Sequence, residues 1–190
     1  MFLNYLLTRA GVPADTVSVT AIGSAATAVA AVERGKVDAG WMADPAFTLL
    51  KRRSPHVRVL ADLRTAEGVK AAFGTTTYPA AVLYTNRQWF GDNRETCARL
   101  ARAIARTLDW MQTHSAEEIA GRTPKSLRGD DDALYVEALK ASMAMFSADG
   151  TMSADGAAAV RTLLAQSNDK VRGATIELSN TFTNELIHGR

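Results

Sequence analysis

Hydrophobic and polar positions in the first half of the chain follow two periods, one typical of helices and one typical of strands. Residues 24–33 and 46–53 repeat apolar side chains at helical spacing. Short apolar runs with strand character lie beside them. These candidate strands are residues 17–22, 37–42, 56–60 and 80–84. Because strands that alternate with helices form layered domains, this order predicts an α/β architecture with a buried, parallel sheet.

The second half of the chain has a helical pattern throughout. Residues 92–111 place apolar side chains at every third or fourth position, with arginines on the opposite face, which predicts a long helix. Ser115 and Glu118 are spaced as a capping box at the start of the next helix. We expect two further helices at about residues 131–146 and 154–166.

Two stretches depart from these regular patterns. Residues 64–78 contain Gly68, Gly74 and three consecutive threonines, so they predict a loop or a crossing between two parts of the chain. Residues 2–7 form an amphipathic helical piece with no capping residue before it. We therefore expect the first turn of this helix, and a strand before it, to lie outside the sequence.

The first strand–helix–strand unit carries the candidate chemistry. Residues 23–25 join a strand to a helix whose first backbone N–H groups lack intrahelical partners and suit an anion or a polar ligand atom. An aromatic and an acidic residue follow the next strand, at the same end of the unit. This arrangement predicts a small-molecule site, and it is equally compatible with an ordinary helix cap and a buried tryptophan. The candidate residues are Gly23, Ser24, Ala25, Trp41, Asp44 and Pro45.

Charge and cysteine content narrow the classes of function. The formal net charge is +2, from 22 basic and 20 acidic residues, and the densest basic cluster, residues 51–53, is typical of the last turn of a helix. No nucleic-acid surface is predicted. The single cysteine, Cys97, excludes an internal disulfide and lies on an apolar helical stripe, which favours a small buried hydrophobic side chain over a nucleophile.

Motifs for catalysis or metal binding are missing from the sequence. The three histidines, His56, His114 and His188, are scattered, and no cysteine pairs accompany them. Ser24 has no nucleophile-elbow context, and the turn before it is not a phosphate-binding loop. We therefore predict no catalytic residue, no metal and no cofactor. The chain also shows no signal peptide and no membrane-spanning run, which by itself would indicate a cytoplasmic protein.

Several longer stretches, taken in order, resemble one known family. The sequence is similar to the substrate-binding proteins of ABC importers in the nitrate/sulfonate/taurine and NMT1/THI5-like group, with the N-terminal part of such proteins lacking. The resemblance covers essentially the whole chain. It rests on residues 21–39, 41–45 (WMADP), 59–64 (VLADLR), 78–84 (YPAAVLY), 110–120 and 179–186.

The resemblance implies a fold and a domain division. The fold would be that of a type II periplasmic binding protein, with two α/β lobes and a ligand cleft between them. Residues 1–77 would form most of the second lobe, which is N-terminally incomplete. Residues 78–190 would supply a return strand and C-terminal helices to the first lobe. The candidate residues named above would face the cleft, and Tyr78, at the lobe crossing, would either reach the ligand or pack at the hinge.

The resemblance also implies a ligand and partners. The solute would be small and anionic or heteroaromatic, of the sulfonate, nitrate-like or pyrimidine class, with its anionic end at Ser24 and its body near Trp41 and Asp44. An inner-membrane ABC permease would be the partner, the location periplasmic and the protein not an enzyme. An exposed sheet edge would also permit a homodimer.

Two alternatives stay open from the sequence. A ligand-sensing domain of a LysR-like regulator would need a helix-turn-helix upstream of the sequence. A fragment of a thiamine-pyrimidine-synthase-like enzyme would need catalytic histidine and cysteine motifs in the first lobe.

Overall fold

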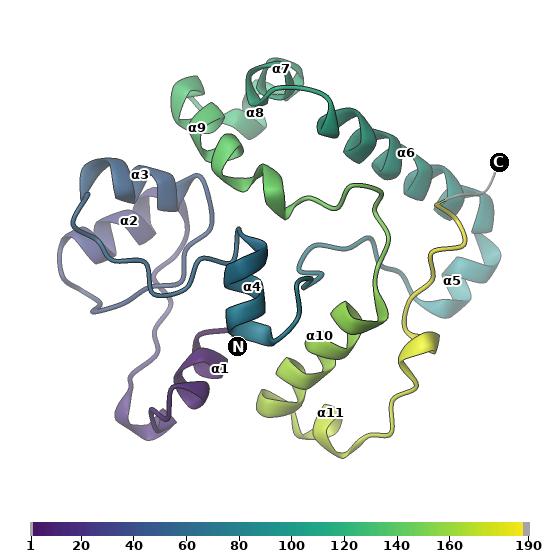
Figure 1. Cartoon of the computed structure of the whole chain (residues 1–190), viewed down its shortest axis with the longest axis horizontal. Coiled ribbons are helices and arrows are strands. Elements are labelled where there is room, and N and C mark those ends of the chain that lie inside the picture. Colours follow the sequence, from purple (N-terminus) through teal and green to yellow (C-terminus); the bar gives the residue numbers. More distant parts are fainter. Residues whose placement is uncertain (1, 188–190) are drawn as a thin grey trace. The chain divides into compact units, whose positions relative to one another are not determined.

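The computed structural model describes residues 2–187, and every regular element in that range is a helix (Figure 1). The chain folds into two compact units, each built from segments that are distant in sequence. The first unit comprises Phe2–Arg64 and Ser115–Ala144. The second unit comprises Thr65–His114 and the chain from Met145 onward.

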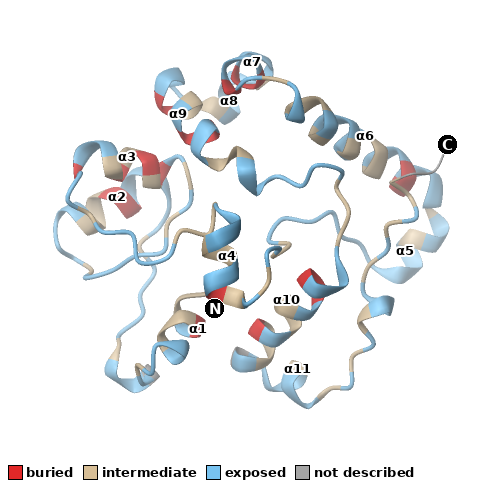
Figure 2. Ribbon diagram, in the orientation of Figure 1, coloured by how far each residue is buried: buried red, intermediate tan, exposed pale blue. Residues whose placement is uncertain are grey.

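The first unit is centred on two short helices that pack against each other. Val29, Ala46 and Leu50 form one buried hydrophobic cluster in its core. Figure 2 shows buried positions on both α2 and α3. Half-buried Met42 and Val57 pack against this cluster. The helices are α1 (Phe2–Arg9), the 3-10 helix η1 (Ala14–Thr16), α2 (Ala25–Glu33), α3 (Ala46–Arg53), α7 (Ala116–Arg122), α8 (Lys125–Arg128) and α9 (Asp132–Ser142).

The second unit contains the longest helix, which the arginine-rich pattern predicted. Cys97 is buried on this helix, as expected, and Leu163 is the most deeply buried leucine of the unit. Thr77 and Ser153 join distant segments through their hydroxyl oxygens, 2.9 Å apart. The helices are α4 (Ala66–Phe73), α5 (Arg87–Asp92), α6 (Arg94–Gln112), α10 (Ala154–Ser167), α11 (Asp169–Gly173) and η3 (Leu178–Asn180), and η2 (Met143–Met145) lies where the chain passes between the units.

The α/β prediction is wrong for the described residues. None of the four candidate strands forms a sheet within residues 2–187. A strand must share its backbone N–H and C=O groups with a neighbouring strand, and no ladder of such bonds joins these segments in the described chain. Several of their apolar side chains are exposed, such as Leu60 (74%) and Tyr84 (87%), whereas Met42 and Val57 pack against the core cluster. The type II periplasmic-binding-protein architecture, and the sheet edge expected to support a homodimer, are therefore not observed.

The expected loop at residues 64–78 is also partly wrong, because α4 lies inside it. The Thr65 side chain accepts a hydrogen bond from the Gly68 N–H, which caps the start of this helix. Gly74 ends it in the left-handed conformation, with φ of 77°. Gly68 and Gly74 suggested a loop, whereas one is tolerated in the first helical turn and the other is a C-terminal cap.

Helix boundaries elsewhere agree with the sequence. Ser115 accepts a hydrogen bond from the Glu118 N–H, and the Glu118 carboxylate accepts one from the Ser115 N–H, so the predicted capping box is confirmed. The division at residue 77 remains a prediction. Over residues 2–187, every helix is too short or too polar to cross a lipid bilayer.

Candidate functional site

The strand-to-helix junction at residues 23–25 has an unusual backbone. Gly23 has φ of 76°, and a Cβ atom there would lie 2.4 Å from Thr27 Oγ1. Only glycine therefore fits. The Thr27 hydroxyl donates a hydrogen bond of 2.7 Å to the Ser24 carbonyl, which holds the turn closed.

Helix α2 begins immediately after this turn with its N-terminal groups exposed. Ser24 is the N-cap residue, and among the described residues its side chain makes no capping hydrogen bond. Ala25, the first helical residue, has φ of 48°, which is strained for a residue with a Cβ atom. The junction thus presents an uncapped helix N-terminus and an available hydroxyl to solvent.

The second candidate segment runs beside the first. A Cβ atom at Gly40 would lie 3.3 Å from Ile22 Cδ1, so the residues just before Gly23 and just before Trp41 are in contact. Trp41 is 43% exposed, and its ring stacks on Phe2 at a centroid distance of 4.8 Å and an interplanar angle of 5°. The tertiary structure therefore brings the two predicted segments together in the first unit.

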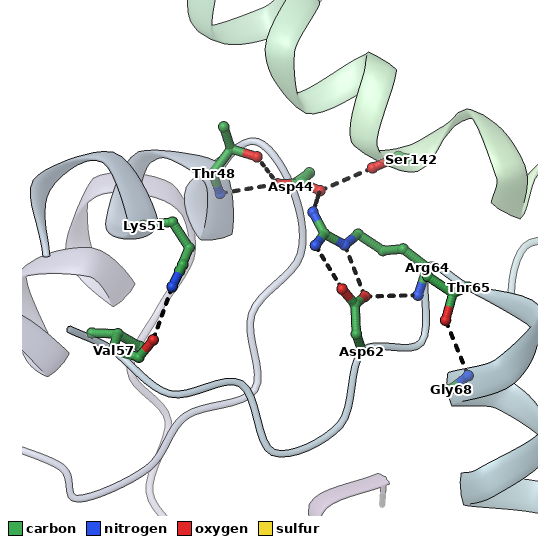
Figure 3. A network of polar contacts seen from close by, with 9 residues as sticks. All are labelled: Asp44, Thr48, Lys51, Val57, Asp62, Arg64, Thr65, Gly68 and Ser142. Carbon is green, nitrogen blue, oxygen red and sulfur yellow. Dashed lines mark hydrogen bonds and ion pairs between the residues drawn. The ribbon is translucent and has the colours of Figure 1, made fainter. Parts of the chain in front are cut away.

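Asp44 is the centre of a polar network (Figure 3). Its Oδ1 accepts hydrogen bonds from the Thr48 N–H at 3.0 Å and from the Thr48 hydroxyl at 2.6 Å, so it satisfies one of the unpaired N–H groups in the first turn of α3. Its Oδ2 accepts one from the Ser142 hydroxyl at 2.9 Å and one from Arg64 Nη1 at 3.1 Å. Pro45, the next residue, precedes α3 as its N-cap.

Arg64 joins this network to a second carboxylate. Its Nε and Nη2 donate to the two oxygens of Asp62, at 2.9 and 2.7 Å. The guanidinium carbon lies 4.6 Å from the centre of the Phe47 ring, which gives a cation–π contact. Arg64 is therefore held on three sides by its own unit.

These contacts keep all three groups charged at neutral pH. Partial burial raises the pKa of Asp44, but the hydrogen bonds from Thr48, Ser142 and Arg64 outweigh it and hold that pKa below its ordinary value. The bond from Arg64 likewise lowers the pKa of Asp62, and the two carboxylates raise the pKa of Arg64.

The sequence pattern pointed only to Asp44 in this network, and it missed four members: Thr48, Asp62, Arg64 and Ser142. Asp62 and Arg64 stand two residues apart in the ADLR stretch, and an acid and a base at that spacing are a weak local signal for a paired turn. Ser142 is 98 positions from Asp44, and no local pattern reports such a contact.

Tyr78, the remaining candidate, belongs to the second unit. Its ring stacks on Phe73 at a centroid distance of 4.5 Å, so it packs against the end of α4. A role at the solute remains a prediction.

The histidines are not grouped in the described structure. His114 stacks on Trp110, with Nδ1 2.7 Å from the Trp110 carbonyl oxygen, while His56 is exposed in the first unit. His188 lies outside the described residues. No cluster of histidine, cysteine and acidic side chains that could hold a metal occurs in the part of the chain that the structure describes.

Comparisons with known proteins give an independent line of evidence. A solved structure of a protein from Bordetella bronchiseptica RB50 is similar, with a TM-score of 0.84 and 31% sequence identity over 97% of this chain and 57% of that chain. The present chain thus spans little more than half the length of that protein. No curated protein matches the sequence significantly.

The model of one family, described as NMT1/THI5 like, matches residues 1–118. Members of this family are mostly substrate-binding proteins. The chain belongs to the NMT1/THI5-like family.

Proposed function

We propose that this protein is the solute-binding component of an ABC importer and acts in the periplasm with an inner-membrane permease. The family match over residues 1–118 is the observation that carries the proposal. The arrangement at residues 23–25 and 41–45 supports it, because both segments lie side by side in one unit and offer an aromatic ring and polar backbone groups to solvent.

The solute that we propose is small and either anionic or heteroaromatic, of the sulfonate, nitrate-like or pyrimidine class. An anionic end suits the N–H groups of α2, where the helix dipole is positive. A planar body suits the exposed ring of Trp41, which Phe2 holds from one face. Within the first unit, the residues proposed to contact the solute are Gly23, Ser24, Ala25 and Trp41, and Asp44 and Pro45 belong to the turn that carries Trp41. A solute contact for Tyr78, which belongs to the second unit, is a separate prediction.

Isothermal titration of the full chain tests this function. The probes are an alkanesulfonate, nitrate and a neutral aminopyrimidine. We expect a sulfonate or the pyrimidine to bind, and Trp41→Ala to weaken that binding about tenfold through loss of the stacking surface. Trp89→Ala is the matched control, since Trp89 is similarly exposed (39%) but lies on α5 of the second unit.

Two results would contradict the proposal. Tight binding of nitrate with no binding of the larger probes would leave only the nitrate-like class and would exclude a solute body stacked on Trp41. Equal losses in Trp41→Ala and Trp89→Ala would exclude a specific role for Trp41.

A further inference from the structure

The carboxylate of Asp44 has no acceptor position left for a solute. A carboxylate offers about four hydrogen-bond acceptor positions. Four donors already reach Asp44 in the first unit, two from Thr48 and one each from Ser142 and Arg64. A solute amino or hydroxyl group could bind Asp44 only by displacing one of them. Asp44 therefore acts as an internal anchor of the segment that carries Trp41.

Arg64 is the cationic donor to this anchor, and its position is fixed in advance. The fork to Asp62 uses two of its nitrogen atoms, and the Asp62 carboxylate also accepts the Arg64 backbone N–H at 3.1 Å. The ring of Phe47, from α3, covers the guanidinium. Its side chain is only 22% exposed, so the pair with Asp44 is partly shielded from solvent screening.

Helix α9 supports the same segment from another direction. Ser142, the last residue of α9, binds Asp44 at the start of α3. At the other end of α3, Arg52 pairs with Asp131, the N-cap of α9, at 3.3 Å. The two helices therefore run antiparallel and are joined at both ends. The Arg52 pair is exposed, whereas Asp44 is only 12% exposed.

We infer that Arg64 is a positioning residue of the solute site: it holds Asp44 in place and compensates its charge, so that an anionic solute is tolerated beside Trp41. This inference rests on the proposed solute-binding function. The network contains one positive and two negative side chains. Removal of Arg64 would leave two carboxylates uncompensated near the proposed site, and these would repel an anion.

Two substitutions separate charge from packing. Arg64→Met keeps an apolar stem against Phe47 and removes the charge. Arg64→Lys keeps the charge and loses the fork to Asp62. Arg52→Met is the matched control, because it removes an exposed arginine that links α3 and α9 without touching Asp44.

The first measurement is the affinity for an alkanesulfonate and for a neutral aminopyrimidine, by titration. In Arg64→Met we expect the sulfonate affinity to fall about three- to tenfold and the pyrimidine affinity to change less, with partial recovery in Arg64→Lys. Equal changes for both probes would assign Arg64 a purely structural role and overturn the inference.

The second measurement needs no solute. The fluorescence of Trp41 is isolated by subtracting the spectrum of the same protein carrying Trp41→Phe. Quenching of this signal by iodide, caesium and acrylamide is then measured with Arg64 present and in Arg64→Met. In Arg64→Met we expect weaker quenching by iodide and stronger quenching by caesium, relative to acrylamide. An unchanged iodide-to-caesium ratio would overturn the inference. Failure of the wild-type chain to bind either solute would instead contradict the proposed function and leave the quenching result as the test of Arg64.

Discussion

Asp44 is a shared acceptor for three separate parts of the first unit. Thr48 on α3, Arg64 in the following loop and Ser142 at the end of α9 all donate to it. Because a partly buried carboxylate is costly unless its acceptor positions are filled, these donors account for its stability there. Its position in the turn could be predicted from the sequence, whereas its role could not, since that depends on donors up to 98 residues away.

The stability contribution of Asp44 should depend on pH. Its pKa is lowered in the folded chain, so its contribution is complete above the ordinary pKa of about 4 and is lost as the pH falls through the lowered value. Asp44→Asn should therefore lower the free energy of unfolding by about 1–3 kcal/mol at pH 7, because Arg64 loses one of its two charged partners. Below pH 4 the difference from wild type should shrink.

Thermal melting from pH 7 to pH 3 measures this difference. Asp38→Asn serves as the control, since Asp38 is exposed in the loop before Trp41. A difference between Asp44→Asn and wild type that stays constant over this pH range would show that the ionised carboxylate is not what stabilises the turn.

At the scale of elements, α2 is the helix whose start departs from ordinary geometry. Its first residue, Ala25, adopts a left-handed φ of 48°, which costs about 1–2 kcal/mol for a residue other than glycine. Strain of this kind is retained where the surrounding structure or a function requires it. Ala25 lies within the proposed anion-binding turn, and binding of an anion there would account for the retention of this strain.

Replacement of two alanines in α2 should have opposite effects. Ala25→Gly relieves the strained φ and should leave stability unchanged or raise it by up to about 1 kcal/mol, after the entropic cost of glycine. Ala30→Gly, in the helix interior, should lower stability by about 1 kcal/mol. Urea denaturation compares the two midpoints. A larger loss for Ala25→Gly than for Ala30→Gly would show that Ala25 does not carry strain.

Helices and strands differed in how well local sequence predicted them. An α-helix satisfies its hydrogen bonds within one segment, so the spacing of apolar residues and caps such as Ser115 predicted α6, α7, α9 and α10 correctly. A strand depends on a neighbour that may come from any part of a chain. The apolar runs at residues 17–22 and 80–84 therefore carried a strand signal without forming a sheet in the described residues.

At the scale of the whole molecule, each compact unit combines segments that are distant in sequence: Thr65–His114 separates the two segments of the first unit, and Ser115–Ala144 separates those of the second. The first unit takes α7, α8 and α9 from the middle of the sequence and packs α9 against α3. This arrangement explains why Asp44 and Ser142 meet.

We expect the chain to self-associate, because apolar side chains at residues 80–84 are exposed. Val82, Leu83 and Tyr84 are 48%, 55% and 87% exposed and lie outside every helix. Exposed apolar surface of this kind favours association with another copy. Light scattering should show a dimer whose fraction rises with protein concentration, and Leu83→Lys should weaken this dimer. Leu127→Lys, which changes another exposed leucine on α8, should leave it unchanged. A monomer at all concentrations would contradict this expectation.

Local pattern alone predicted most of the helices, the capping box and the buried Cys97. These features depend on residues within a few positions of one another, which is the range over which spacing and capping act. The tertiary structure decided the absence of a sheet in the described residues, the contact between Ile22 and Gly40, and the occupation of Asp44 by Arg64 and Ser142. Such contacts join positions far apart in the chain, and they form only when packing brings complementary donors, acceptors and apolar surfaces together.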